Sequence, residues 1–313
     1  MRRPPAARSA ASLAVGALAL GGLAAGWAIG VEPRWPVLRR VTVPLPPADR
    51  SSTRPALRVL HVSDLHLATP SPRVEAFLAR ALDAEPDLVV ATGDLLGGAA
   101  GIPAVARALG ERRGVPGLVV LGSNDAYGPT PSNPLRYLRT RRERVLGPPL
   151  DTDRLVRALT ERGWQVLENA RTTVTTAAGP VAVAALGDPH IGRDRPMRLG
   201  PRPSAPEPGV PAPVLRLGLV HAPYQRALAA LAADGAELIL AGHTHGGQVR
   251  VPGVGALTTN CDLPRRQARG LSRASPEGPW LHVSAGLGVS ASGPMRFACR
   301  PEATLLEVVP AAH

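Results

Sequence analysis

The sequence contains no lysine, so every basic side chain other than histidine is an arginine. Only 3% of the residues are aromatic, which leaves few rings on which the bases of single-stranded nucleic acid could stack. The two cysteines, Cys261 and Cys299, match no zinc-binding spacing. They can pair if the domain is exported, or they can be two buried free thiols. The composition therefore argues against a nucleic-acid partner and against a cysteine-based zinc site.

What is present is a long, moderately hydrophobic chain with an excess of positive charge. Its 313 residues, 44% of them hydrophobic, suffice for one large domain whose core is built from alanine, valine and leucine. The formal net charge of +12 favours anionic partners such as phosphates or acidic lipids. The same charge is equally typical of a solvated basic surface.

The N-terminal part of the chain carries an uncharged stretch from Ser9 to Val31, preceded by Arg2, Arg3 and Arg8. Its 23 residues are enough to cross a hydrocarbon core of about 30 Å as a helix. We therefore predict a single-pass anchor in the cell membrane, with a cleaved signal peptide as the alternative. Arginines flank the stretch on both sides, so the positive-inside rule does not fix the orientation of the chain in the membrane. Of the two orientations, we favour the one that places the large domain outside the cytoplasm.

Two further features accompany this stretch. Gly22, Gly26 and Gly30 recur at four-residue spacing, which would allow two such helices to pack closely in a homodimer. Residues 32–56 contain six prolines and predict a stiff, extended tether. The expected organisation is an N-terminal segment over 1–31, the tether over 32–56 and one large domain over 57–313.

From residue 57 onward, short apolar runs alternate with amphipathic stretches, a pattern that predicts an α/β domain with a substantial parallel component. The runs 280–284 and 303–309 have no helix between them and predict additional antiparallel strands. The Pro-rich stretches 129–150 and 193–213 predict irregular surface loops. The other predicted strands are 57–62, 88–92, 118–121, 181–186, 215–220 and 238–241, and the predicted helices are 72–84, 102–113, 151–162 and 224–234.

Polar residues that can bind metal follow the predicted strands in five separate segments. Asp64 and His66 come after the first strand, and a spacing of two puts both side chains on one side of an extended backbone. His243 and His245 repeat this spacing after the last of the six strands. Because ligands of open α/β sheets sit beyond the carboxyl ends of the strands, we expect the segments to meet at one site. The other members are Asp94, Asn124 and His221.

Two carboxylates, four imidazoles and an amide exceed what one metal ion needs, and they suit a pair. Mixed oxygen and nitrogen ligands favour Mn, Fe, Zn or Co over Ca. Taken alone, an Asp-x-His pair is a weak signal, and a single histidine such as His221 is more often an ordinary core residue. The glycines around His243 and His245 strengthen the metal interpretation, because they let the backbone approach a ligand closely.

The segments LRVLHVSDLHL, DLVVATGD, VVLGSND, LVHAPY and LILAGHTHGGQ resemble, in order, the calcineurin-like metallophosphoesterase family, and most closely its membrane-anchored bacterial branch. The resemblance covers nearly the whole chain from residue 57. It implies a four-layer α/β/β/α sandwich, preceded here by the N-terminal transmembrane helix, and a dinuclear metal site. By that pattern Asp64, His66 and His245 hold one metal, and His221 and His243 hold the second. Asp94 bridges both.

One segment departs from the family pattern. Where the family has Gly-Asn-His-Asp or Gly-Asn-His-Glu, this chain has Gly122-Ser123-Asn124-Asp125, so the usual histidine is absent. In strict register Ser123 replaces the ligating asparagine, whereas a shift by one residue makes Asn124 the ligand. We favour Asn124, because an amide oxygen is a better neutral ligand than a hydroxyl. His190 is a candidate replacement for the missing proton donor, although a merely structural His190 is the plainer interpretation.

The resulting prediction is a hydrolase that uses two divalent metal ions to cleave phosphomonoester, phosphodiester or pyrophosphate bonds. A nucleotide–lipid or phospholipid-type substrate would suit the predicted anchor, and a phosphate-containing small molecule is also compatible. The departure at Ser123 and Asn124 permits a metal-binding pseudo-enzyme or a phosphate-ligand sensor instead. The basic charge permits a nuclease of the same fold.

Overall fold

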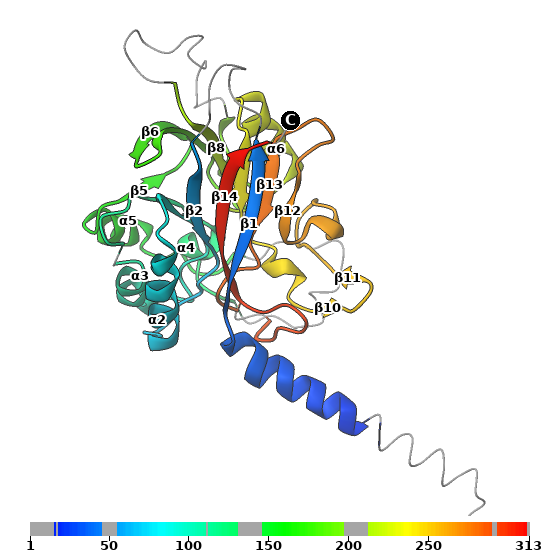
Figure 1. Ribbon diagram of the computed structural model, residues 1–313. Coiled ribbons are helices and arrows are strands. Elements are labelled where there is room, and N and C mark those ends of the chain that lie inside the picture. The colour runs from blue at the N-terminus through cyan, green and yellow to red at the C-terminus, as the bar shows by residue number, and fades with distance from the viewer. Residues whose placement is uncertain are drawn as a thin grey trace, which may run out of the picture.

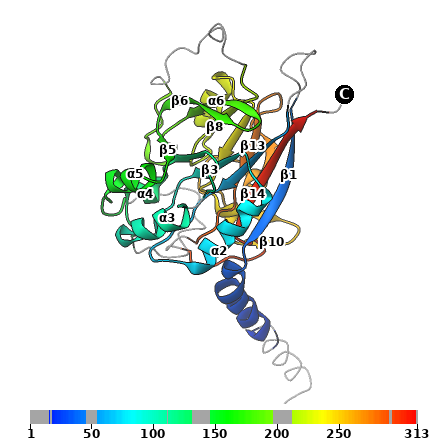
Figure 2. The same ribbon diagram turned by 60° about the vertical axis from the view of Figure 1, so that its left-hand side comes forward.

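The computed structural model describes residues 16, 18–45, 55–110, 112–130, 146–196, 212–289 and 293–311. Two six-stranded mixed sheets pack face to face, and helices cover their outer faces (Figures 1 and 2). The first sheet has the order β1-β14-β2-β3-β4-β5 and the second the order β12-β13-β9-β8-β7-β6. The predicted α/β fold is confirmed, and the arrangement has four layers.

The elements have the following bounds. The strands of the first sheet are β1 Val37–Leu45, β2 Leu57–Val62, β3 Leu88–Thr92, β4 Gly117–Val120, β5 Trp164–Leu167 and β14 Glu302–Pro310. Those of the second are β6 Ala170–Thr176, β7 Gly179–Ala185, β8 Leu215–Leu219, β9 Leu238–Ala241, β12 Gly270–Arg273 and β13 Trp280–Val283. A separate hairpin joins β10 Arg250–Val251 to β11 Gly255–Ala256. The helices are α2 Pro72–Ala81, α3 Ile102–Ala108, α4 Ser123–Ala126, α5 Thr152–Thr160 and α6 Gln225–Ala233.

Strand direction decides which loops meet. β2, β3, β4 and β5 are parallel to one another, and so are β7, β8, β9 and β13. The prediction of antiparallel strands at the C-terminal runs is half right. β13 is antiparallel to β12 but parallel to β9, and β14 is antiparallel to β2 but parallel to β1.

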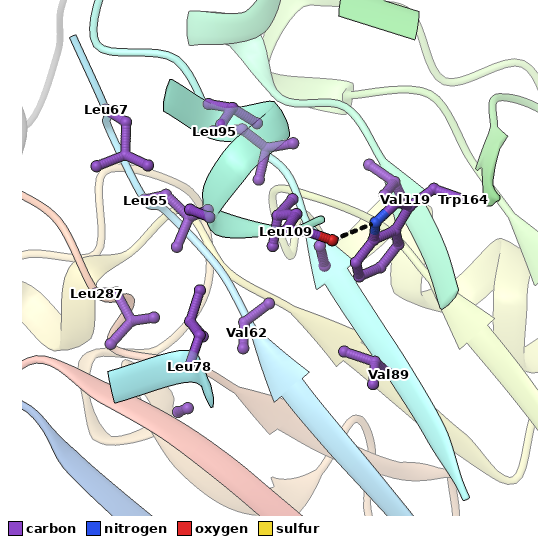
Figure 3. Close-up of a cluster of buried hydrophobic side chains, with 14 of the residues drawn as sticks. Val62, Leu65, Leu67, Leu78, Val89, Leu95, Leu109, Val119, Trp164 and Leu287 are labelled. Carbon is purple, nitrogen blue, oxygen red and sulfur yellow. Dashed lines mark hydrogen bonds between the residues drawn. The ribbon is translucent and has the colours of Figure 1, made fainter. Parts of the chain in front are cut away.

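Alternation along the strands divides the apolar side chains among three cores. In β2, Leu60 and Val62 face the helices α2, α3 and α5, whereas Leu57 and Val59 face the second sheet. Figure 3 shows the first of these cores, where the Trp164 indole packs among aliphatic side chains and donates a hydrogen bond of 2.7 Å to the Leu109 carbonyl. A third core lies between the second sheet and α6.

The helices start and stop where local chemistry requires it. Ser71 accepts a hydrogen bond from Val74 N–H and caps α2, which has Pro72 in its first turn. α3 ends at Ala108, short of the predicted residue 113, because Gly110 follows and glycine disfavours a helix.

Strand β1 corrects the prediction of a tether over residues 32–56. Residues 37–45 form an edge strand that pairs with β14 along its whole length, and Val43 and Leu45 are buried between the sheets. Proline content misled the prediction: Pro44 is tolerated because an edge strand has one side without a partner strand. The alternation of Val41, Val43 and Leu45 was the better signal.

Residues 18–26 are helical and continue into a π-helical turn, Trp27–Val31, and a 3₁₀ turn, Glu32–Arg34. In the part of the chain that the structure describes, no helix combines the length and the apolar character needed to cross a membrane. The predicted span, residues 9–31, lies partly outside the described residues. Most of the predicted loops 129–150 and 193–213 also lies outside them.

Candidate metal centre

The eight predicted site residues all lie in segments that directly follow strands, at one end of the two sheets. β2 leads to Asp64 and His66, β3 to Asp94, and β8 and β9 lead to His221 and to His243 with His245. Asn124 lies in the single turn α4 after β4, and His190 in the 3₁₀ turn Pro189–Ile191 after β7. The expectation that separate strand ends converge on one place is what the structure shows.

Two groups of side chains there can each hold a metal ion. Asp64, His66 and His245 offer ligand atoms within 4.8 Å of one another, and so do Asp64, Asp94 and His221. In the first group the Nε2 atoms of His66 and His245 are 3.1 Å apart, and their rings are stacked. His245 Nε2 is 3.4 Å from Asp64 Oδ1.

Asp64 is common to both groups, and Asp94, a member of the second, has one carboxylate oxygen toward a histidine of each group. Its Oδ2 is 3.8 Å from His66 Nε2, and its Oδ1 is 3.3 Å from His221 Nε2. The Nε2 atom of His221 is fully buried and forms no hydrogen bond. The other ring nitrogen of His221, Nδ1, is 2.6 Å from the Thr92 carbonyl oxygen. A buried nitrogen without a hydrogen-bond partner, aimed at a carboxylate, fits a metal ligand.

His243 is held beside this group by its backbone and its ring. Its N–H donates to both carboxylate oxygens of Asp64, at 3.2 and 3.1 Å. Its Nε2 is 3.2 Å from the Asn260 carbonyl oxygen, and its ring centre is 5.4 Å from that of His221. The carbonyl fixes a proton on Nε2 and leaves Nδ1 as the candidate ligand atom.

The backbone of these loops is strained. Asp64, His66, Asp94, His243 and His245 all have φ between 45° and 70°, a region that non-glycine residues rarely adopt. Each such residue costs on the order of 1–3 kcal/mol, and strain of this kind is concentrated at functional sites. Gly242 shows how tight the approach is, because a Cβ there would lie 2.5 Å from Asp64 Oδ2.

Burial and neighbouring charges set the protonation of the site. Burial lowers the pKa of His66 to about 4 and that of His245 well below its usual value, so both rings are neutral. Burial also acts on Asp94 and His221, but the attraction between them and the other opposite charges and hydrogen bonds around each group together outweigh it. The pKa of Asp94 is held well below its usual value and the pKa of His221 well above. A cation bound there would replace the His221 proton.

The Asn124 side chain, rather than that of Ser123, reaches the carboxylate between the groups. Asn124 Nδ2 lies 2.5 Å from Asp94 Oδ2, and Asn124 N–H donates to Asp94 Oδ1 at 2.8 Å. Ser123 is buried in the same turn. The choice of Asn124 over Ser123 as the ligand stays a prediction, because the atom at Asp94 is the amide nitrogen of Asn124 and not its oxygen, and it lies on the carboxylate oxygen that faces His66.

His190 lies at the edge of the site. Its ring centre is 4.2 Å from that of His243, and its Nδ1 is 2.9 Å from the Tyr224 hydroxyl. A proton donor must be within reach of the leaving group, so the role of His190 stays a prediction. Tyr224 was not among the predicted site residues, although the segment LVHAPY contains it.

Asp125 and Arg296 organise the site and were also missed. Asp125 accepts hydrogen bonds from Leu95 N–H and Leu96 N–H and fixes the loop after Asp94. Arg296 is fully buried, with its guanidinium 3.4 Å from His245 Nδ1 and bonded to backbone carbonyls. No local pattern marks Arg296, because its contact with the site joins it to His245, 51 positions away, and its other partners are backbone carbonyls. Cys261 and Cys299 are free thiols.

These loops, their paired carboxylate–histidine groups and the packed mixed sheets define a metal-dependent hydrolase of phosphate esters. The chain belongs to the calcineurin-like phosphoesterase family, whose model matches residues 57–247. It is a metallophosphoesterase with residues placed to bind divalent metal.

Two curated relatives are similar over most of their length. Phosphodiesterase YaeI of Escherichia coli K12 is 27% identical over 257 residues, which cover 80% of this chain and 82% of that protein. The uncharacterized metallophosphoesterase YkoQ of Bacillus subtilis 168 is 27% identical over 278 residues, 85% of this chain and 89% of that protein.

Among solved structures, TT1561 of Thermus thermophilus matches with a TM-score of 0.40 and 15% identity, covering 75% of this chain and 91% of that chain. Phosphopantetheinyl hydrolase from Mycobacterium tuberculosis matches with a TM-score of 0.37 and 12% identity, covering 78% and 96%.

Proposed function

We propose that the protein hydrolyses phosphate esters with two divalent metal ions held side by side, and that Asp94 is shared between them. The observation that carries this proposal is the placement of the two Asp94 oxygens, one facing His66 and the other facing His221. The first half-site is Asp64, His66 and His245. The second half-site is His221, His243 and Asn124. The ions are Mn, Fe, Zn or Co, because the ligands mix oxygen and nitrogen.

When bound, a metal pair supplies an activated water and neutralises charge on the phosphoryl oxygens. The protein residues do the positioning. Asp125 holds the loop after Asp94, and the Thr92 and Asn260 carbonyls fix the ring orientations of His221 and His243. His190, hydrogen-bonded to Tyr224, is the side chain we assign to protonate the leaving group, since Asn124 cannot donate a proton at neutral pH.

For the substrate we propose a phosphodiester or pyrophosphate carried by a lipid or a nucleotide–lipid, at a membrane that the N-terminal segment contacts. The name of the relative YaeI supports a diester. The exposed leucines of helical residues 18–26 support membrane contact. We propose an extracytoplasmic domain, no nucleic-acid partner and, through Gly22, Gly26 and Gly30, a homodimer in the membrane.

Metal analysis of purified protein, followed by a substrate panel, tests this function. We expect close to two metal ions per chain, and hydrolysis of an aryl phosphodiester that stops on chelation and returns with Mn or Zn. Activity with a single metal ion per chain would overturn the dinuclear assignment.

A second candidate, a phosphate-binding pseudo-enzyme, is favoured by one observation: position 124 is asparagine and not histidine. It predicts metal and phosphate binding without turnover on any member of the panel.

A further inference from the structure

Nearly all the large apolar side chains that the described residues expose lie at the end of the sandwich that carries the metal centre. Seven belong to residues 18–35, among them Trp27 at 42% and Trp35 at 51% exposure. Val251 and Val254, at 40% and 70%, lie in the β10–β11 hairpin. Apart from these nine, Leu146 completes the set. Soluble proteins rarely gather apolar surface in this way unless something covers it.

The two apolar segments are attached to the same loop. Arg296 N–H donates to the Ala28 carbonyl at 2.8 Å, and the Glu32 carboxylate accepts from Ala298 N–H. One residue away in this loop, the Phe297 carbonyl accepts from Arg250 N–H of the hairpin. The end of the helix and the hairpin therefore contact the same loop, and Figures 1 and 2 both show them at the lower end of the domain.

The metal centre faces the same way. Val37, the first residue of β1, is level with Glu302 of β14, and Thr304 two residues later pairs with His61. Because β14 is antiparallel to β2, the chain enters the sheet beside the carboxyl end of β2, where Asp64 begins the site. The exposed helix thus joins the domain at the end where the site lies.

We propose, on the basis of the proposed function, that the end of the domain with the metal centre docks on a lipid bilayer. The metal centre then binds the phosphate group of a lipid headgroup as its substrate. The two tryptophans suit the polar–apolar boundary of a bilayer, where amphipathic rings concentrate. Arg34, Arg250 and Arg269 lie at the same end and bond to carbonyls or sulfur, so their charges attract anionic headgroups.

Tryptophan fluorescence on vesicles of phosphatidylcholine and phosphatidylglycerol tests the docking. In full-length protein, Val254→Trp adds an indole to the hairpin, and Ala177→Trp adds one to the exposed β6–β7 turn at the opposite end. With bromine on the lipid acyl chains, we expect the added emission of Val254→Trp to be quenched and that of Ala177→Trp to stay unchanged. Equal quenching, or none at position 254, overturns the proposal.

Activity separates this proposal from the proposed function. The pair Val251→Asp and Val254→Asp should lower turnover of a vesicle-borne phosphodiester by about tenfold or more, because apolar contact with the bilayer is lost. The same protein should hydrolyse a soluble aryl phosphodiester at the wild-type rate. If wild type does not hydrolyse the soluble aryl phosphodiester, the proposed function is wrong, and the fluorescence experiment still tests docking independently.

A second, independent observation concerns two buried histidines between the sheets. His61 on β2 and His282 on β13 are fully buried, and their Nδ1 atoms are 2.9 Å apart. His61 Nε2 is 2.8 Å from Thr92 Oγ1, which donates to Ser63 Oγ at 2.8 Å. Ser63 Oγ donates to Asp64 Oδ2 at 2.6 Å. A continuous chain of hydrogen bonds runs from the second sheet to a predicted metal ligand.

The donor-to-acceptor direction of these hydrogen bonds follows from the bond to Asp64. The Ser63 hydroxyl donates its proton to Asp64, so the Thr92 hydroxyl donates to Ser63 and must accept from His61 Nε2–H. A neutral His61 then accepts at Nδ1, and His282 Nδ1–H is the donor. Burial lowers the pKa of both rings, which keeps them neutral as this order requires.

We infer that Ser63, Thr92, His61 and His282 are positioning residues that hold Asp64 in the orientation that binds metal. Such partners beyond the ligands themselves typically change metal affinity by about 10–100-fold. Thr304 offers a matched control. It pairs with His61 across the sheet, and its buried hydroxyl has no hydrogen-bond partner.

Calorimetric titration of metal-free protein with Zn, together with melting temperatures, tests this. We expect His61→Leu and Ser63→Ala each to weaken binding by about tenfold or more, and the double variant to be no weaker than Ser63→Ala. His61→Gln, which keeps a donor toward Thr92, should regain part of the loss, and Thr304→Val should bind as wild type. Unchanged affinity in His61→Leu with a lowered melting temperature, or additive effects, would show a role in folding only.

Discussion

The two half-sites differ in the groups that contact their histidine rings on the side away from the proposed metal. In the second, the Thr92 and Asn260 carbonyls accept from the ring nitrogens that face away from the proposed metal. In the first, the Arg296 guanidinium lies 3.4 Å from His245 Nδ1. A carbonyl makes an imidazole a better metal ligand and a cation makes it a poorer one. The two ions are therefore expected to bind with different strength, the second half-site more tightly.

The largest effect is expected from removing Asp94, which should abolish the difference in metal affinity between the two half-sites. Asp94→Ala removes the carboxylate that faces both half-sites, so we expect loss of most of both metals and a fall in kcat/KM of roughly 10³-fold or more. Elemental analysis and kinetics on the same preparation check this. Asp151→Ala, which removes a helix cap far along the chain, serves as a control for general damage. Retention of two metal ions by Asp94→Ala would contradict the shared position of this residue.

A matched pair of variants sharpens the comparison. His221→Ala should lose the tighter ion, and His245→Ala the weaker one. At limiting metal we expect His245→Ala to retain close to one ion per chain and His221→Ala less. Limited chelation of wild type should likewise leave one ion, and anomalous diffraction would locate it. Occupancy of the first half-site alone after chelation would reverse the ranking.

Substitution of Asn124 tests whether this residue binds metal in the second half-site or only occupies the place of a proton donor. An alkoxide of high pKa leaves poorly unless it is protonated, whereas an aryl oxide leaves as an anion. Without a proton donor, wild type should therefore prefer aryl phosphoesters or pyrophosphates, whereas equal rates on alkyl and aryl substrates would indicate that His190 supplies the proton. If Asn124 is a ligand of the second half-site, as we propose, Asn124→His lowers metal content and slows both substrates. If it is not a ligand, the same change raises kcat/KM on alkyl substrates more than on aryl ones, by up to roughly 10²-fold. Ser123→Ala is the matched control.

The smallest expected effect is on the pH dependence of the free energy of unfolding, through His282, which lies outside both half-sites. Burial lowers the pKa of His282 from 6.5 to about 4, with Glu302 opposing it and His61 as its hydrogen-bonded neighbour. Between these values the unfolded chain binds a proton that the native protein does not. The contribution of His282 to the free energy of unfolding should therefore fall by about 3 kcal/mol as pH drops from 6.5 to 4. Urea denaturation of metal-free protein measures this slope, which His282→Gln should reduce and Thr304→Val should keep.

Much of the fold was predictable because short continuous apolar runs reflect strands that are buried on both faces. The runs 57–62, 88–92 and 238–241 match β2, β3 and β9 residue for residue. Strands β5, β6 and β12 were missed, because each exposes polar residues to solvent and lacks a long apolar run. β1 was mistaken for a tether because its prolines obscured its alternation.

By itself the sequence determined the family, the strand ends that carry the ligands and the types of ligand atom, since each of these depends on residues close together in the chain. Only the tertiary structure decided which side chains meet. Asp94 lies between the half-sites, Arg296 stands behind His245, and His61 joins His282 across the two sheets. Such contacts join residues up to 221 positions apart. They depend on how the two sheets pack and on strand direction, and no local pattern of residues records either.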